Sequence, residues 1–380
     1  MATKRLFDTD AYIRSFDAVV TGCEKQGKHY AITLTQTAFF PEGGGQAPDT
    51  GLLGGVEVTD VQEHGGVIVH TCLAPLLVGE TVEGEINWPQ RLGRMQQHSG
   101  EHILSGIVHA MTGFSNVGFH MGSDFTTVDF SGKLSDEAIA EVMAQANAVV
   151  RQNVPIRAWY PKEEELSSLT WRSKKEIEGP LRLVEIPGTD LCACCAPHVA
   201  RTGECGPIVI LGREVIHGGT RLQLLCGEAA MTHLTAVLAE NRGISALLSA
   251  KPMETCAAVR RTLDEVGQLK LQLSQTTREL YAALAEAHQN RGNVLLFRES
   301  GDAGKLACAV AETCGGKCAM FIPAETGFRC AVAEKDGDLQ AFGKELFSAL
   351  GGRGGGRGGL IQGSVTANRR EIEAYFGRTL

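Results

Sequence analysis

Four side chains that suit a metal ion stand in two pairs, about ninety residues apart in the chain. His98 and His102 are separated by four positions, and so are Cys194 and His198. Residues four apart on a helix share a face, so both imidazoles of the first pair can reach one ion. A thiolate and a third imidazole from a later loop would complete a shell of one sulfur and three nitrogens, which suits zinc. The spacing predicts one zinc ion held by both pairs.

Each pair alone is a weak signal, and other interpretations exist for both. Ser99 occupies the position where a zinc protease of the HExxH type needs a glutamate base, so that class is disfavoured. Cys194 has the four-residue spacing to His198, but Cys192 and Cys195 are not excluded as the sulfur ligand. The three cysteines also fit small buried thiols. The metal interpretation is favoured because the two partial sets together make a complete shell.

Three consecutive glycines, Gly43, Gly44 and Gly45, precede Gln46 in the segment FFPEGGGQ. Glycines let a bulky ligand approach the backbone, and the N–H groups of such a loop can bind carbonyl or phosphate oxygens. The Gln46 amide can orient a substrate or a water molecule. An ordinary β-turn is the alternative, because glycine runs alone are not specific.

A second glycine-rich segment, residues 351–363, is predicted to form a loop near the end of the chain. It lacks the lysine and hydroxyl residue that end a P-loop. Residues 351–370 hold four arginines and no acid, which predicts a compact positive surface for RNA phosphates. These arginines are Arg353, Arg357, Arg369 and Arg370. A flexible linker is disfavoured because a strand-like segment, residues 360–365, follows directly.

The composition is typical of a soluble protein that stays in the cytoplasm. A length of 380 residues predicts two or three domains, and 43% hydrophobic with 21% charged residues indicates globular folding. No apolar run approaches a membrane span, and the N-terminus lacks the apolar core of a secretory signal. The 12 cysteines are therefore expected as reduced thiols. A net charge of −8 argues against a protein that coats nucleic acid, but it allows a local basic patch.

The hydrophobic pattern predicts an α+β core that follows a small N-terminal β-barrel or sandwich. A helical, partly coiled-coil linker then leads to a C-terminal α/β glycine-rich domain. Short strands are expected at residues 29–34, 56–61 and 66–70, and helices at 89–112 and 136–152. The expected domains are residues 1–88, 89–250, 251–290 and 291–380.

Apolar residues recur with a 4-3 spacing between Val259 and Ala287. Lys270 and Thr277 interrupt the spacing, so the segment is a short and imperfect heptad region. A dimeric coiled coil and an amphipathic helix packed on its own domain are equally compatible with this pattern.

Taken together, these motifs resemble the editing domain of alanyl-tRNA synthetase and its free-standing relatives, the AlaX proteins, in their long form. That family carries a glycine-rich loop, an HxxxH helix and a CxxxH loop followed by a TGE-like turn. The corresponding residues are 41–46, His98 with His102, Cys194 with His198, and 202–204. The C-terminal domain resembles the C-Ala domain of the same synthetases. One departure is the cysteine loop, where Cys195 and Pro197 replace the small residues of the family's CGGTH.

The resemblance implies a zinc-dependent hydrolase that acts in trans on tRNA(Ala) wrongly charged with serine or glycine. We expect no attachment activity, because the chain begins at the barrel with no room for an ATP-binding class II core. Thr37 resembles a position where the family places a serine-sensing threonine, although Thr33 and Thr35 share its predicted strand. The linker, residues 259–287, and the C-terminal domain are expected to form a homodimer.

Two questions stay open at this point. Four protein ligands usually mark a structural zinc, so the ion either polarises the ester directly or organises the pocket while Gln46 directs water. The main alternative function is a non-catalytic tRNA-binding module with a structural zinc. A metallohydrolase of small amino-acid esters or amides is the third possibility.

Overall fold

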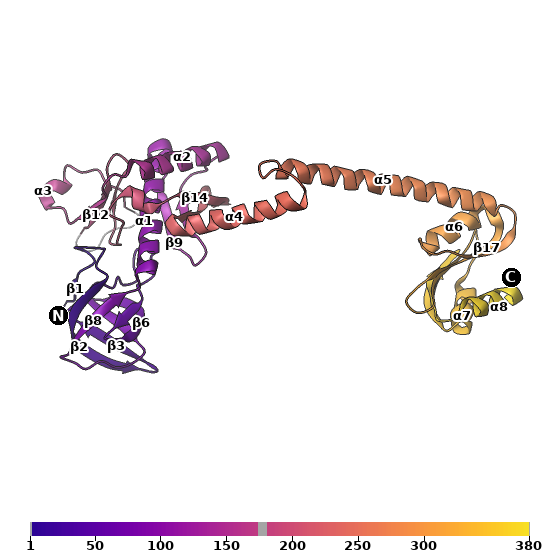
Figure 1. Cartoon of the computed structure of the whole chain (residues 1–380), viewed down its shortest axis with the longest axis horizontal. Coiled ribbons are helices and arrows are strands. Elements are labelled where there is room, and N and C mark those ends of the chain that lie inside the picture. Colours follow the sequence, from indigo (N-terminus) through magenta and orange to yellow (C-terminus); the bar gives the residue numbers. More distant parts are fainter. Residues whose placement is uncertain (1, 174–180, 380) are drawn as a thin grey trace. The chain divides into compact units, whose positions relative to one another are not determined.

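The computed structural model describes residues 2–173 and 181–379, which divide into two compact units (Figure 1). The first unit comprises residues 1–243 and the second comprises residues 244–380. The boundary falls within helix α4 (Gly227–Leu247). Across both described ranges, none of the helices has the length and hydrophobicity that crossing a bilayer requires.

The first unit begins with a closed six-stranded barrel, which confirms the barrel and excludes the sandwich. Its strands follow one another in the order β2-β3-β7-β6-β5-β8. They are β2 (Ser15–Gln26), β3 (His29–Leu34), β5 (Gly51–Leu53), β6 (Val56–His64), β7 (Val67–Cys72) and β8 (Thr81–Ile86). Strict alternation of exposed and buried residues in β8 shows one face turned to the barrel core. Outside the barrel, β1 (Lys4–Arg5) pairs in parallel with β4 (Gln36–Thr37).

Helix α1 (Trp88–Thr112) follows the barrel directly and carries the histidine pair. Asn87 caps its N-terminus by accepting from the Gln90 N–H, and Pro89 occupies an early position where no N–H is needed. Gly113 ends the helix with a left-handed φ of 74°. The segment from Gln97 to Val108 is buried throughout, so α1 is a central element of the unit.

Two sheets and further helices surround α1 and complete the α+β part. The four-stranded sheet has the order β14-β15-β10-β9 and the three-stranded sheet the order β11-β12-β13. The strands are β9 (Asn116–Met121), β10 (Thr126–Phe130), β11 (Arg157–Trp159), β12 (Leu183–Ile186), β13 (Asp190–Ala193), β14 (Ile208–Ile216) and β15 (Gly219–Cys226). The helices are α2 (Asp136–Gln152), α3 (Glu163–Leu166) and the 3₁₀ turn η1 (Thr202–Cys205).

The second unit packs helices on both faces of a five-stranded sheet with the order β16-β17-β18-β20-β19. Its strands are β16 (Gly292–Phe297), β17 (Gly315–Pro323), β18 (Phe328–Glu334), β19 (Gly352–Arg357) and β20 (Leu360–Val365). Its helices are α5 (Thr255–Ala287), α6 (Ala303–Cys314), α7 (Gln340–Ala349) and α8 (Arg369–Thr379).

The prediction of a glycine-rich loop at residues 351–363 was wrong, because this segment forms a β-hairpin. Strand β19 pairs with β20 along its whole length and lies at the edge of the sheet. A Cβ at Gly354 would lie 2.2 Å from Phe347 of α7, so glycine allows the helix to pack closely on the strand.

Candidate metal centre

The four predicted ligands converge in the first unit, although they come from α1 and from the loop after β13. Their ligand atoms all lie within 4.8 Å of one another. The Cys194 Sγ is 3.5 Å from the Nε2 of His98 and 3.4 Å from the Nε2 of His198. A tetrahedral zinc with standard bond lengths has sulfur–nitrogen edges of about 3.6 Å, so this spacing suits one ion.

Each of the three imidazoles is held at its outer nitrogen by a different polar group. The Nδ1 of His98 lies 3.0 Å from Gln46 Oε1, and the Nδ1 of His198 lies 3.0 Å from Ser99 Oγ. The Nδ1 of His102 lies 3.0 Å from Asp190 Oδ2. These contacts leave every Nε2 facing the centre of the group. Outer partners of this kind orient histidines for metal binding.

One buried nitrogen supports a metal at this centre. The Nε2 of His102 is buried and has no hydrogen-bond partner in the described parts of the chain. An unpaired buried polar atom is costly unless a ligand satisfies it. Three imidazole nitrogens and one sulfur match the donor set of zinc, so the residues fit the predicted ion.

Electrostatics favour a thiolate at Cys194. Burial opposes ionisation of this thiol, but His98 and His198 hold its pKa well below the usual value. Burial also opposes the charge on His102, yet the Asp190 carboxylate and Cys194 raise the pKa of His102 to about 9. The thiolate is the form that binds metals. A zinc ion entering the site therefore has to displace a proton from His102.

Asp190 is in turn clamped by an arginine that the sequence analysis did not single out. Arg172 donates from Nε to Asp190 Oδ1 at 2.8 Å and from its terminal nitrogen to Oδ2 at 2.9 Å. This bidentate pair fixes the plane of the carboxylate that faces His102. Burial would raise the pKa of Asp190, but His102 and Arg172 together lower it. Arg172 therefore positions a predicted ligand without touching the metal group itself.

The cysteine loop is held by a second arginine, which is buried. Arg182 donates to the carbonyls of Cys194 and Ala196, both at 3.0 Å. Cys192, one alternative sulfur ligand, lies with His102 and Asp190 on the far side of the imidazole. Cys195, the other alternative, is exposed, and its sulfur lies 3.7 Å from a Cβ built at Gly44. The structure therefore places Cys194, rather than its neighbours, among all three histidines.

The glycine loop reaches this centre from the barrel. Gly43 and Gln46 close a tight turn through reciprocal backbone hydrogen bonds, and Gly44 and Gly45 have φ values of 60° and 82°. A Cβ at Gly45 would lie 2.8 Å from Phe119, whose ring packs on His98. The Oε1 of Gln46 is used by His98, whereas its Nε2 is buried without a described partner. The loop thus presents one free amide donor beside the metal group.

A buried ion pair ties the end of this loop to α1. Arg91 donates from Nε to Asp49 Oδ2 at 2.8 Å, and the same oxygen accepts from the Phe40 N–H at 2.7 Å. Both charged side chains are buried. Breaking such a pair by removing one partner is costly, so the loop has a fixed position relative to the histidine helix.

Thr37 lies in the barrel core. Its hydroxyl accepts from the Phe39 N–H at 3.1 Å and lies 2.9 Å from the Nε2 of His70. Burial lowers the pKa of His70 to about 4, so this imidazole is neutral near pH 7. In this arrangement the Thr37 hydroxyl contacts His70 and the Phe39 N–H, and its part in sensing serine stays a prediction.

The four C-terminal arginines do not share one environment. Arg353 and Arg357 are exposed on the edge strand β19, and their even spacing puts them on one face. Arg369 lies over the ring of Phe297 at 4.5 Å and pairs with Glu373 at 2.8 Å. Arg370 is exposed on α8. Arg353 and Arg357 are therefore the better placed of the four to meet an RNA backbone.

Comparison with known families matches both parts of the first unit. The model for the threonyl and alanyl tRNA synthetase second additional domain matches residues 181–222, which include Cys194 and His198. The model for class II (A) tRNA synthetases matches residues 12–90, which span the barrel. Part of the first unit, including Cys194 and His198, is therefore similar to the second additional domain of these synthetases.

Relatives that match most of the chain include proteins named for alanyl-tRNA editing. The chain is 25% identical to alanyl-tRNA editing protein AlaX-L of Pyrococcus horikoshii, covering 97% of this chain and 96% of that protein. It is 27% identical to alanyl-tRNA editing protein Aarsd1-A of Xenopus laevis, over 92% and 89% of the two chains. These matches confirm the resemblance to the long AlaX form that the motifs indicate.

A ligase is also similar but much longer. The alanine–tRNA ligase of Pyrococcus furiosus is 30% identical over 98% of this chain, which spans only 42% of that enzyme. The shared region is therefore less than half of the ligase.

Proposed function

We propose that this protein hydrolyses the ester of mischarged tRNA(Ala), with Ser-tRNA(Ala) as the main substrate and Gly-tRNA(Ala) as a second one. The observation that carries the proposal is the convergence of His98, His102, Cys194 and His198 under the glycine loop. The similarity to proteins named for alanyl-tRNA editing supports the choice of RNA. The aminoacyl ester would be hydrolysed in trans, without ATP.

In this proposal, the four ligand residues bind the ion and Gln46 contacts the substrate. A bound zinc would supply positive charge that polarises an ester carbonyl and orders the pocket. Four protein ligands favour the ordering role. Gln46 then takes the contact with the reacting group, because its buried Nε2 can donate to the carbonyl oxygen or to water. The aminoacyl ester is already labile, so positioning supplies most of the required rate gain.

Recognition of the rest of the tRNA is assigned to the second unit in this proposal. Exposed Arg353 and Arg357 flank Gly355, where a Cβ would meet no atom within 4 Å, so a phosphate backbone can approach the strand. Helix α5 carries the seam of exposed apolar residues that supports a homodimer, including Leu263 and Leu273.

The central experiment replaces His102 with alanine in the full chain. Zinc content and deacylation of serine-, glycine- and alanine-charged tRNA(Ala) are measured on the same preparation. We expect His102→Ala to lose both zinc and activity, because the variant removes one of four ligands. His64→Ala is the matched control, since His64 is exposed at the end of β6. A wild-type protein that binds tRNA and zinc but deacylates nothing would establish the non-catalytic alternative.

A further inference from the structure

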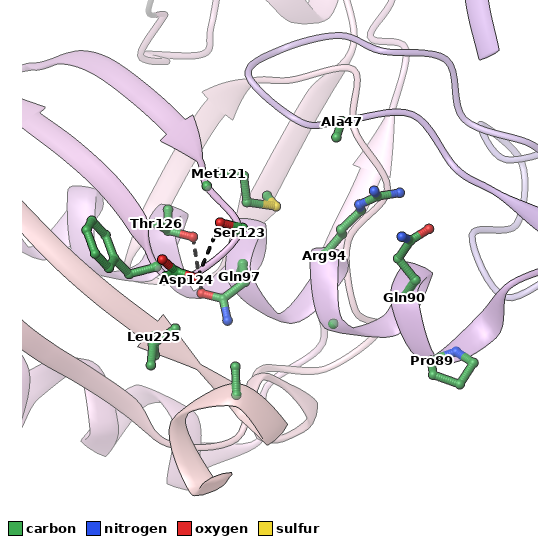
Figure 2. Close-up of a pocket in the computed structure, with 14 residues that line it drawn as sticks. Ala47, Pro89, Gln90, Arg94, Gln97, Met121, Ser123, Asp124, Thr126 and Leu225 are labelled. Carbon is green, nitrogen blue, oxygen red and sulfur yellow. Dashed lines mark hydrogen bonds between the residues drawn. The ribbon is translucent and has the colours of Figure 1, made fainter. Parts of the chain in front are cut away.

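A cavity of about 360 Å³ lies beside the N-terminal half of α1, within the first unit (Figure 2). Its polar wall includes Arg94 and Gln97 of α1 and Asp124 of the β9–β10 turn. Its apolar wall includes Met121, Phe125 and Leu225. This volume is within the usual range for small-molecule sites, and the mixed lining suits a ligand with both a flat apolar part and polar groups.

Gly93 is an unexpected residue in this wall. It lies inside α1, where glycine costs about 1 kcal/mol relative to alanine. No packing requires it, because a Cβ at this position would meet no atom within 4 Å. By contrast, a Cβ at Gly100 of the same helix would lie 2.3 Å from Cys226 Sγ. The absence of a side chain at Gly93 therefore leaves space in the cavity, and it is not needed to avoid a clash with a neighbouring residue.

Three links connect residues that line the cavity with residues of the metal group or the glycine loop. Gln97 precedes His98, and Arg94 lies one helical turn, about 6 Å, before it. Ala47, which also lines the cavity, follows Gln46. Met121 donates its N–H to the carbonyl of Gly45 at 3.3 Å, so the β9–β10 hairpin is fastened to the glycine loop.

We infer that this cavity binds the terminal nucleoside of the RNA strand whose ester is cut, and that Gly93 is the specificity-determining gap that admits it. The identity of the occupant rests on the proposed function. An ester has an acyl side and an alcohol side. The acyl side belongs at the metal group, so the neighbouring cavity receives the ribose and base.

The lining groups match the parts of a nucleotide. Asp124 is exposed and can accept hydrogen bonds from ribose hydroxyls. The side chain of Arg94 is 17% exposed, lies 3.8 Å from Asp49 Oδ1 and donates to the Pro48 carbonyl, and its remaining N–H groups can donate to a phosphate oxygen. Phe125, Met121 and Leu225 provide apolar contact for the base. Figure 2 marks the hydrogen bonds from Ser123 to Asp124 and from Thr126 to Gln97 among these lining residues.

The test fills the cavity from Gly93 in the full-length protein. AMP binding is measured by calorimetry, and hydrolysis is measured on 3′-O-seryl-AMP and on serine methyl ester. We expect Gly93→Leu to weaken AMP binding and to raise KM for seryl-AMP by about tenfold or more. Hydrolysis of the methyl ester, which has no nucleoside, stays at the wild-type rate. Zinc content also stays unchanged.

Two control variants separate filling from other effects of the substitution. Gly93→Ala adds a helix-favouring Cβ with little volume, and it weakens AMP binding less than Gly93→Leu does. Gly243→Leu adds leucine at another helical glycine whose Cβ would meet no atom within 4 Å, and it keeps AMP binding. A third variant tests the contact with ribose. We expect the wild type to bind AMP more tightly than 2′,3′-dideoxy-AMP, and Asp124→Ala, a change at an exposed position, to bind both equally because it lacks the accepting carboxylate.

The results distinguish this inference from the proposed function. A wild-type protein that binds no AMP, or a Gly93→Leu variant that binds it as tightly as wild type, overturns the nucleoside cavity. Deacylation of charged tRNA would still support the proposed function in that case. Conversely, if Gly93→Leu abolishes AMP binding and the wild type hydrolyses no ester, the cavity is retained and the hydrolase is rejected.

Discussion

The three histidines of the metal centre differ in what holds them from behind. Gln46 offers an amide oxygen to His98, Ser99 a hydroxyl to His198, and Asp190 a carboxylate to His102. Only the carboxylate carries a charge, and it raises the pKa of His102 against the opposing effect of burial. Arg172 restrains that carboxylate. We therefore expect zinc affinity to depend more on Arg172 and Asp190 than on the other outer contacts.

Weakening the contacts of Arg172 and Asp190 should lower zinc affinity without removing a ligand. We expect Asp190→Asn to reduce affinity by about 10- to 100-fold, because the amide cannot match the carboxylate at His102 Nδ1. Arg172→Gln should reduce it less. Competition with a chromophoric chelator measures both affinities.

The matched control for Arg172 is Arg221, which makes the same bidentate contact with Asp129 at 2.7 Å on each arm. That pair lies on β15 and β10 and holds no histidine of the metal group. Equal losses of zinc affinity in Arg221→Gln and Arg172→Gln would show that general destabilisation is responsible.

The sequence indicates the four predicted ligand residues, but it does not indicate the residues that hold them in position. Four-residue spacing identifies His98 with His102 because both lie on one face of a helix. Cys194 and His198 have the same spacing but lie in a loop, so their approach depends on the fold of that loop. The outer contacts of Gln46 and Asp190 join residues 52 and 88 positions apart, so only the folded chain reveals them. The choice of Cys194 over its neighbours likewise depends on the direction of side chains within one loop.

At the scale of elements, glycine determines how closely α1 approaches the strand that supports the metal centre. A Cβ at Gly106 would lie 2.4 Å from the carbonyl oxygen of Thr189 and 2.9 Å from the Cβ of Asp190. Gly106 is one turn after His102, so this close approach brings Asp190 to the imidazole. The packing of one helix on one strand thus fixes the geometry of the metal centre.

Gly106→Ala should therefore affect stability and zinc affinity together. We expect the free energy of unfolding to fall by about 1–3 kcal/mol, because backbone at Thr189 has to move. Zinc affinity should fall as Asp190 is pushed away from His102. Denaturant unfolding and chelator competition measure these effects. Gly93→Ala, which meets open space on the same helix, should leave both quantities at or above the wild-type values.

Regular elements with a clear hydrophobic period were predictable. The predicted strand at residues 29–34 and helix at 136–152 coincide with β3 and α2. The glycine-rich segment before residue 360 was not predictable as a strand, because glycine has low β-propensity. Its pairing with β20 and the close packing of Phe347 against Gly354 override that preference.

At the scale of the whole molecule, the metal centre and the exposed arginines belong to different units. Under the proposed function, the first unit cuts the ester and the second supplies affinity for the tRNA body. The two activities should therefore respond to different substitutions.

Replacing Arg353 and Arg357 by serine should weaken tRNA binding without changing zinc content. Log affinity decreases with log salt, and this dependence should become less steep by about one unit of slope for each phosphate that the variant no longer neutralises. Binding titrations at several salt concentrations measure this slope. Arg369→Ser is the control, since Glu373 already neutralises Arg369. An unchanged slope in the double variant would move the RNA-binding surface elsewhere.

The predicted dimer can be tested on α5 by comparing two exposed leucines. Leu273 is 68% exposed and lies on the heptad seam, whereas Leu271 is 60% exposed and lies off it. We expect Leu273→Glu to shift the protein to monomers in sedimentation equilibrium, and Leu271→Glu to leave the dimer intact. Dissociation by neither variant, or by both equally, would contradict a coiled-coil seam.

The cysteine loop that carries Cys194 contributes residues to two hydrophobic cores. Ala196 packs in the barrel core, and Val199 packs in the core of the α+β part. The barrel contributes Gln46 to the same place. Recombination between relatives at the barrel boundary would consequently separate parts that have to fit one another. A chimeric protein would bind its ion only if the barrel from one relative fitted the cysteine loop from the other.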